Sequence, residues 1–254
     1  MIYAILCEKG GTGKTTTAEA LNDGLRERGQ RVLILDADPQ TNITAAMSAD
    51  RSKPTLYDVF MGECSAADAI QTTGRGDLIP GDRNLALIHG SPRQLRDALQ
   101  PIRGRYDYIV IDCPPAMGTL SINALTAADA AIIPVEAAPY SLQALGSIRA
   151  TVQTVQERSN PALKIRGILI CHFFGRTVVN RDIARMIEDA AAKLDTTTFK
   201  TKIRECSAIR TAQANRQSIF SYAPRSNAAK DYAAFIDELT AQDAPHATFT
   251  GGAI

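Results

Sequence analysis

The sequence predicts an α/β protein: a doubly wound, mostly parallel sheet flanked by helices. Short, continuous apolar runs recur along the chain, and such runs are typical of strands buried on both faces of a parallel sheet. Spans of helix-forming residues separate these runs, and alternating strands and helices predict a parallel sheet covered on both faces. With 254 residues and 45% apolar content, the chain is large enough to bury one substantial core.

The N-terminal part reads as a strand, a loop, a helix and a second strand. Residues 2–7 are apolar and run into glycines, 15–28 favour a helix closed by Gly29, and 31–36 are again apolar. Further strands are predicted in the ranges 106–115, 130–135 and 165–171, and helices in 119–128 and 139–157. The repeated unit is therefore a strand, a helix and a parallel strand.

Two regions are less regular. Between residues 50 and 105 we expect short helices at 55–61 and 91–99 and a strand at 77–79. After Lys200 we expect a polar loop, a short helix and a final helix at 226–240. No linker or repeat interrupts the pattern, so we expect one domain over residues 1–242 and a flexible C-terminal tail at 243–254.

Composition excludes several classes of protein. There is no apolar run of about 18 residues and no basic leader before the first apolar run, so we expect a soluble protein without a signal peptide. The cysteines are odd in number, widely separated and without a C-x-x-C pair, which argues against a zinc or iron–sulfur site. We expect free thiols in a reducing cytoplasm. The five cysteines are Cys7, Cys64, Cys113, Cys171 and Cys206.

Charge is distributed unevenly, although the net charge is only +1. Residues 166–230 contain 12 Lys and Arg against 5 Asp and Glu, an excess of +7 that leaves −6 for the remainder. Such asymmetry is a candidate electrostatic footprint for a polyanion, although solvated helix faces also collect charge. Charge alone leaves both interpretations open.

The loop after the first strand has the composition of a phosphate-binding loop. Glycines allow consecutive backbone N–H groups to converge on phosphate oxygens, Lys14 can reach the β- and γ-phosphates, and the Thr15 hydroxyl can ligate Mg²⁺. The usual pattern G-x-x-x-x-G-K-[ST] requires glycine at position 8, where this chain has glutamate, followed by Lys9. Taken by itself, Lys9 could also be an ordinary solvent-exposed charge on the loop. The predicted nucleotide-binding residues, called the phosphate loop below, are Glu8, Lys9, Gly10, Gly11, Thr12, Gly13, Lys14, Thr15 and Thr16.

Three aspartates follow apolar strands, at the sheet edge where ligands collect in open α/β sheets. Asp36 and Asp38 lie in the sequence DADPQ, and Asp112 lies in IVIDCPP. A carboxylate in this position can hold Mg²⁺ through water, because Mg²⁺ keeps several waters and takes few protein ligands. A single aspartate such as Asp36 is also common as a helix cap or turn residue. Three of them together with a phosphate loop favour a metal and water site.

The deviant loop K-G-G-x-G-K-[ST] resembles that of a family of P-loop ATPases that includes ParA partition proteins, MinD and the nitrogenase iron protein. The similarity to ParA/Soj-type partition ATPases extends over nearly the whole chain, up to about residue 240. Because the phosphate loop begins at residue 8, we expect the small class without an N-terminal helix-turn-helix domain. The similar segments are VLILDADPQTNITAAM (32–47), TLYDVFMGE (55–63), YDYIVIDCPPAMGTLSINALTAADAAIIPVE (106–136) and YAPRSNAAKDY (222–232).

The resemblance implies a Mg²⁺-dependent ATPase that is slow without a partner. In the family, the residue equivalent to Lys9 reaches across a homodimer to the phosphates bound by the other subunit, so Lys9, Lys14 and Asp38 are the expected catalytic residues. Asp38 would orient the attacking water, while Thr15, Asp36 and Asp112 would support Mg²⁺. Positioning is most of what phosphoryl transfer requires of a protein.

The resemblance also implies partners. Such proteins bind double-stranded DNA without sequence preference as ATP dimers, and a ParB-like centromere-binding protein stimulates hydrolysis and release. We therefore expect a cytoplasmic protein that associates with the nucleoid when ATP is bound. The stretch 203–210 departs from the family, because proline is absent and Glu205 is inserted. The expected DNA contacts are Arg204 and Arg225, with Lys202, Arg210, Arg216 and Lys230 as companions.

Other functions remain open at this point. A MinD-like ATPase would need a basic amphipathic helix at the C-terminus to dock on lipid, and the sequence after Tyr232 is acidic or neutral, so we expect no membrane partner. A nucleotide-gated scaffold that positions cargo other than DNA would share the phosphate loop. The basic stretch is the feature that separates these hypotheses.

Overall fold

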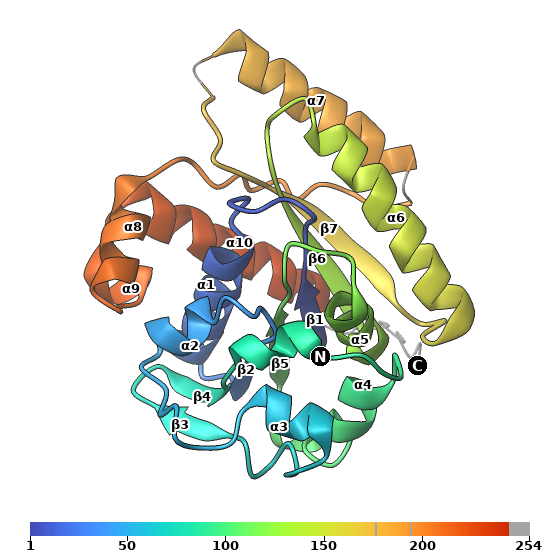
Figure 1. Cartoon of the computed structure of the whole chain (residues 1–254). Helices are drawn as coiled ribbons and strands as arrows, with labels where there is room; N and C mark the ends of the chain where they lie inside the picture. The colour runs from blue at the N-terminus through green and yellow to red at the C-terminus, as the bar shows by residue number, and fades with distance from the viewer. Residues whose placement is uncertain (176, 194, 244–254) are drawn as a thin grey trace, which may run out of the picture.

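The computed structural model describes residues 1–175, 177–193 and 195–243. Within them lies a seven-stranded sheet with the order β3-β4-β2-β5-β1-β6-β7 (Figure 1). Every pairing is parallel except that of β3 with β4. The strands are β1 (Ile2–Ile5), β2 (Val32–Asp36), β3 (Gln71–Thr73), β4 (Gly76–Ile79), β5 (Tyr108–Asp112), β6 (Ala130–Glu136) and β7 (Lys164–Cys171).

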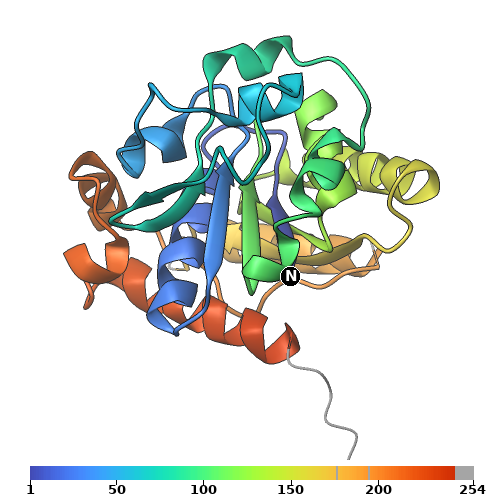
Figure 2. The same ribbon diagram turned by 90° about the horizontal axis from the view of Figure 1, so that it is seen from below.

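Helices cover both faces of the sheet, which confirms the predicted doubly wound α/β fold. On one face α1 and α10 lie side by side, as Figure 2 shows from below, and α6 and α7 pack together on the other side of the molecule. Of the helices described, none is long and apolar enough to cross a bilayer. The helices are α1 (Lys14–Glu27), α2 (Asn42–Ala46), α3 (Leu56–Met61), α4 (Gln94–Leu99), α5 (Thr119–Ala127), α6 (Ser141–Arg158), α7 (Val178–Lys193), α8 (Ser207–Ala214), α9 (Ile219–Tyr222) and α10 (Asn227–Asp243), with 3-10 turns at Arg83–Leu87 and Arg103–Arg105.

Two apolar cores form, one on each face of the sheet. The continuous apolar runs of the strands supply both, because alternate side chains of a strand point to opposite faces. In β1, Tyr3 and Ile5 join the core under α1 and α10, whereas Ala4 joins the opposite core. Phe235 of α10 is fully buried against Phe199, with the two rings at 88° and their centroids 4.8 Å apart.

The strand order creates a crevice at the carboxyl ends of the central strands. The chain passes from β1 to β2, and β5 later inserts between them, while β6 extends the sheet on the other side of β1. In open α/β sheets such a switch in strand order leaves room for a ligand beyond the strand ends. The loop after β1, the Asp36 end of β2 and the Asp112 end of β5 all meet there.

Most predicted elements are present, but four were not predicted: β3, α2, α7 and one of the two short helices α8 and α9, because only one was expected there. β3 is a three-residue edge strand, Gln-Thr-Thr, with no apolar pattern to indicate it. α2 spans only five residues, and the sequence does not distinguish it from a turn. α7 was overlooked although Ile183 and Ile187 are spaced one helical turn apart and are buried. Residues 244–254 of the predicted tail lie outside the described residues.

Candidate nucleotide-binding site

The phosphate loop connects β1 to α1 and takes a shape that only glycine adopts without strain. Gly11 and Gly13 have φ angles of 76° and 94°, in the left-handed region. Gly13 caps the N-terminus of α1 and no side chain there accepts a hydrogen bond from the first turn. The first N–H groups of a helix have no partner within it, and together with the helix dipole they attract an anion. The loop is therefore built to receive phosphate.

Lys14 and Thr15 belong to this loop and also form the first turn of α1. The Lys14 side chain is buried, and its Nζ donates a hydrogen bond to the main-chain carbonyl of Lys9 at 2.9 Å. In the described part of the chain no carboxylate forms an ion pair with it. The Thr15 hydroxyl donates to Asp112 Oδ2 at 2.8 Å. A buried ammonium held only by a carbonyl remains available to an anionic ligand.

Asp36 and Asp112 are fully buried and lie opposite each other at the ends of β2 and β5. Asp36 Oδ2 accepts hydrogen bonds from Thr44 through its main-chain N (2.8 Å) and its hydroxyl (2.6 Å). Asp112 Oδ1 has no hydrogen-bond partner among the described residues. Burial raises the pKa of Asp36 to about 6, and burial together with the Asp36 charge raises the pKa of Asp112 well above its usual range. Two adjacent buried carboxyl groups, one of them with an oxygen that lacks a hydrogen-bond partner in the described ranges, would be stabilised by a bound cation.

Asp38 faces the open side of this edge. Its side chain is buried, and its Oδ1 accepts a hydrogen bond from the main-chain N of Gln40 at 2.9 Å. The main-chain N of Asp38 in turn donates to Asp36 Oδ1 at 3.3 Å. Asp36 thus anchors both Thr44 and the turn that carries Asp38, so the structure brings the three predicted aspartates together.

The side chains at this edge of the sheet fit Mg²⁺ better than a metal whose ligands all come from the protein. Across the described ranges, no three His, Cys, Asp or Glu side chains converge as a metal site. Mg²⁺ keeps several waters and is held by one or two protein oxygens plus phosphates. The orphaned Asp112 Oδ1 and the Thr15 hydroxyl are such oxygens, whereas both oxygens of Asp36 already accept hydrogen bonds.

A cavity of about 590 Å³, called the large cavity below, opens above the phosphate loop. This volume lies in the range of ligand pockets. Gly10, Gly11 and Gly13–Thr16 form one wall, Asp38 and α2 a second, and α8 the third. A small cavity of about 140 Å³ adjoins it, shares Gly13, Thr16 and His172 with it, and extends to Glu205 and Tyr232.

Proteins similar in sequence to this chain include known ATPase-domain and partition proteins. The AAA domain family matches residues 1–165. The chromosome partitioning protein ParA of Caulobacter vibrioides is 39% identical over 197 residues, which cover 72% of this chain and 74% of that protein. The sporulation initiation inhibitor protein Soj of Bacillus subtilis is 35% identical over 251 residues, 94% of this chain and 98% of Soj. The chain belongs to the ParA family of ATPases.

Solved structures similar to this ParA-family chain contain nucleotide. A variant of McdA from Cyanothece, determined as an ATP complex, has a TM-score of 0.82 and 25% identity, and the match covers 94% of this chain and 96% of that one. Cobyrinic acid a,c-diamide synthase from Mycobacterium smegmatis, with bound ATP analogue and magnesium, has a TM-score of 0.79 and 29% identity over 93% and 92% of the two chains. They support nucleotide binding by this P-loop ATPase.

The distinctive lysine of this ParA-family loop is held within its own subunit. Lys9 Nζ lies 2.7 Å from Glu136 Oε2 and 2.5 Å from the Tyr140 hydroxyl, and 4.0 Å from the centre of the Tyr140 ring. The Lys9 side chain is 41% exposed. Glu8 is also tied to α6, because the Ser147 hydroxyl donates to its carboxylate. Glu136 and Tyr140 were not predicted; the only signal for Glu136 is its place at the end of an apolar strand.

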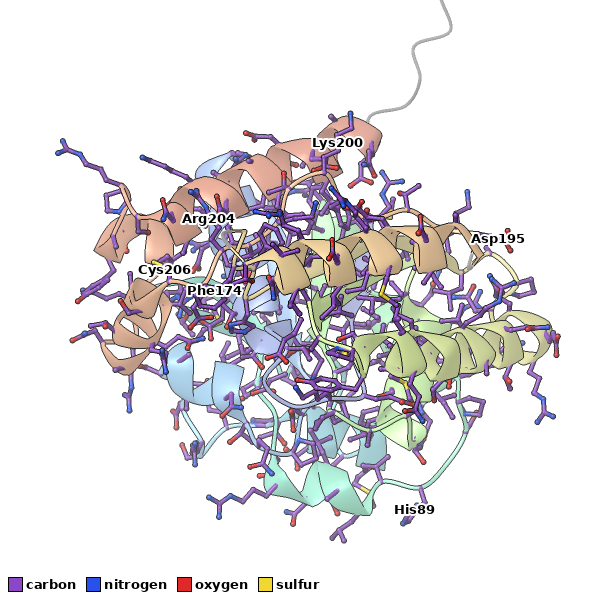
Figure 3. The ribbon with its side chains drawn as sticks, turned by 90° about the horizontal axis from the view of Figure 1, so that it is seen from above. His89, Phe174, Asp195, Lys200, Arg204 and Cys206 are labelled. Carbon is purple, nitrogen blue, oxygen red and sulfur yellow. The ribbon has the colours of Figure 1, made fainter. Side chains whose placement is uncertain are left out.

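The six predicted DNA contacts fall into three settings. Lys202 is paired with Glu188 at 2.8 Å, and Arg204 makes two contacts with Asp231, at 2.9 and 2.6 Å. Arg204 lies on the segment that leads to α8, two residues before Cys206 (Figure 3), and pairs with Phe173 in a parallel bridge. Of the remaining four, two lie on the surface and have no ion-pair partner in the described ranges. The other two line the large cavity. These are Arg225 and Lys230 on the surface, and Arg210 and Arg216 on the cavity wall.

Proposed function

We propose that this ParA-family ATPase is a DNA partition protein. It forms a homodimer around ATP, binds double-stranded DNA without sequence preference, and is released when a ParB-like partner stimulates hydrolysis. The proposal rests on the position of Lys9. Its side chain is 41% exposed near the start of the phosphate loop, whereas Lys14 is buried within the site. A second lysine in this position can serve a nucleotide bound by another subunit, because Lys14 already serves its own.

The other site residues have roles that follow from their positions. Lys14 contacts the phosphates, and Thr15 and Asp112 hold Mg²⁺, which neutralises charge on the phosphates when bound. Asp38, which lines the large cavity, orients the attacking water, and Asp36 fixes the turn that carries Asp38. We assign the small cavity to the base, because it adjoins the phosphate loop at Gly13 and Thr16.

DNA binding rests on the basic stretch 166–230. Arg225 and Lys230 are exposed, and within the described residues neither has an ion-pair or side-chain hydrogen-bond partner. Contacts from lysine and arginine to DNA phosphates displace counterions, so we expect affinity to fall steeply with salt. In the cell such binding would place the ATP form on the nucleoid.

A gel-retardation titration with ATP, ADP or no nucleotide tests the proposal. We expect the ATP form alone to dimerise and to retard two unrelated duplexes equally at low salt. Lys14→Ala serves as the matched control, because its dimerisation and its DNA retardation should both be absent. An ATP-trapped dimer that ignored DNA at low ionic strength would refute the partition function.

A nucleotide-gated scaffold for cargo other than DNA is the second candidate. It is favoured by the ion pairs of Lys202 with Glu188 and of Arg204 with Asp231, which neutralise two of the six predicted DNA contacts. The same titration separates the two, since a scaffold would dimerise with ATP and leave both duplexes unshifted.

A further inference from the structure

α8 is fixed against the phosphate loop and lines the same large cavity as Asp38. Its Gln213 Nε2 donates to the Thr16 hydroxyl at 3.2 Å, and its Ala212 is 2% exposed in a small apolar cluster. Ile209 and Arg210 line the large cavity together with Gln213, which follows them by one helical turn, and Arg216 lines it just beyond the helix. α8 is therefore a wall of the nucleotide site.

Arg216 occupies a backbone position that ordinarily belongs to glycine. Its φ is 54°. The Arg216 N–H donates to the Gln213 carbonyl at 2.9 Å, and the Gln217 N–H donates to the Ala212 carbonyl at 3.0 Å. This is the Schellman ending of a helix, in which a side chain at the left-handed residue is disfavoured. The Arg216 Nη1 lies 3.4 Å from the Ser48 hydroxyl, just beyond α2, so the side chain spans from α8 to the opposite wall.

The charges around the large cavity explain what these arginines can bind. Glu19 and Asp38 line it and Asp36 and Asp112 lie behind it, against the single lysine Lys14. A polyanion needs more positive charge than Lys14 provides. The Arg210 side chain is 80% exposed, and its ion pair with Glu205 is long, at 3.5 Å. Glu205 also contacts His172. The guanidinium of Arg210 is thus loosely held at the junction of the two cavities.

We propose that Arg210 and Arg216 bind the phosphates of the nucleotide in the large cavity, and are not DNA contacts. This rests on the proposed ATP binding at the phosphate loop. A guanidinium presents paired N–H donors that match phosphate oxygens, and the two arginines close the site from α8. α8 then responds directly to the presence of the nucleotide.

The experiment measures the Kd for ATP–Mg²⁺ by isothermal titration calorimetry with Arg210→Ala and Arg216→Gly. The glycine variant removes the side chain and suits the left-handed backbone, so its thermal midpoint should be equal to or above that of the wild type. We expect each variant to raise the Kd about tenfold, and Arg216→Lys to recover part of the loss. Arg225→Ala is the matched control, with unchanged Kd and weaker DNA retardation.

Two results would overturn this assignment. One is wild-type Kd values for both variants. The other is an unchanged Kd with reduced DNA retardation at saturating ATP, which would return these arginines to the DNA surface. A wild-type protein that bound no ATP would instead refute the proposed function itself.

Discussion

The contact of Lys9 with Glu136 and Tyr140 predicts that the isolated subunit resists dimerisation. If Lys9 serves the nucleotide of a second subunit, its Nζ must first leave the Glu136 carboxylate at 2.7 Å and the Tyr140 hydroxyl. The Tyr140 hydroxyl also donates to Glu136 at 3.0 Å, so the three groups form one closed set. Glu136→Gln removes the charge and keeps the shape, and should favour the ATP dimer.

The size of the effect follows from exposure. Lys9 is 41% exposed and Glu136 25%, so solvent weakens their attraction, and an ion pair of this kind contributes up to about 1 kcal/mol. Two subunits release two such pairs when they meet, a total of about 2 kcal/mol. We therefore expect Glu136→Gln to lower the Kd of the ATP dimer by roughly 30-fold.

Sedimentation velocity over a range of protein concentrations measures this Kd in ATP–Mg²⁺. A non-hydrolysable ATP analogue in place of ATP prevents hydrolysis from depleting the dimer. Asp107→Asn is the matched control, because Asp107 forms an exposed ion pair with Arg31 at 2.7 Å in another part of the molecule. An unchanged or weakened dimer in Glu136→Gln would refute the reasoning, because it would show that Glu136 does not restrain Lys9.

Two further predictions concern the site and its supporting helix. Lys14→Ala should abolish nucleotide binding, because it removes the buried ammonium, whereas Asp38→Ala should bind ATP and accumulate as a dimer, as seen by size-exclusion chromatography. Burial raises the pKa of Glu19 from 4.5 to about 7, so ionising this carboxyl costs the folded state. As pH rises from 4.5 to 7, urea unfolding of the wild type should lose up to about 3 kcal/mol relative to Glu19→Gln.

Each of these predictions has a clear contrary result. Hydrolysis by Asp38→Ala at the wild-type rate would remove its proposed role in orienting water. A stability difference between Glu19→Gln and wild type that stayed constant over this pH range would show that Arg75, which lies 3.2 Å from Glu19, keeps the carboxyl ionised.

The strands were predictable because a buried parallel strand leaves a local signal. The run at residues 31–36 corresponds to β2, and the run at 130–135 to β6. β3 left no such signal: Gln71–Thr73 is held by pairing with β4, and Gln71 by a side-chain hydrogen bond with Asp50. The partner strand is close in sequence, but Gln-Thr-Thr has no apolar pattern that marks it as a strand, and the contact with Asp50 spans 21 positions.

The phosphate loop was predictable in the same way, because its shape and its ligand depend on neighbouring glycines, Lys14 and Thr15. The roles of the basic residues were not. Charge counting places Arg210 and Arg225 in one basic stretch, yet in the fold Arg210 lines the large cavity and Arg225 does not. The position of Arg210 depends on how α8 packs on Thr16, through a contact between residues 197 positions apart.

The sequence by itself determined the order of most strands and helices, the phosphate loop and the positions of the three aspartates at strand ends, because each depends on residues adjacent along the chain. Only the tertiary structure decided which groups meet across the sheet edge. It paired Asp36 with Asp112, left Asp112 Oδ1 without a partner in the part of the chain described, and placed Lys9 on Glu136, 127 positions away. Electrostatic interactions depend on distance in space and burial, and folding alone sets both.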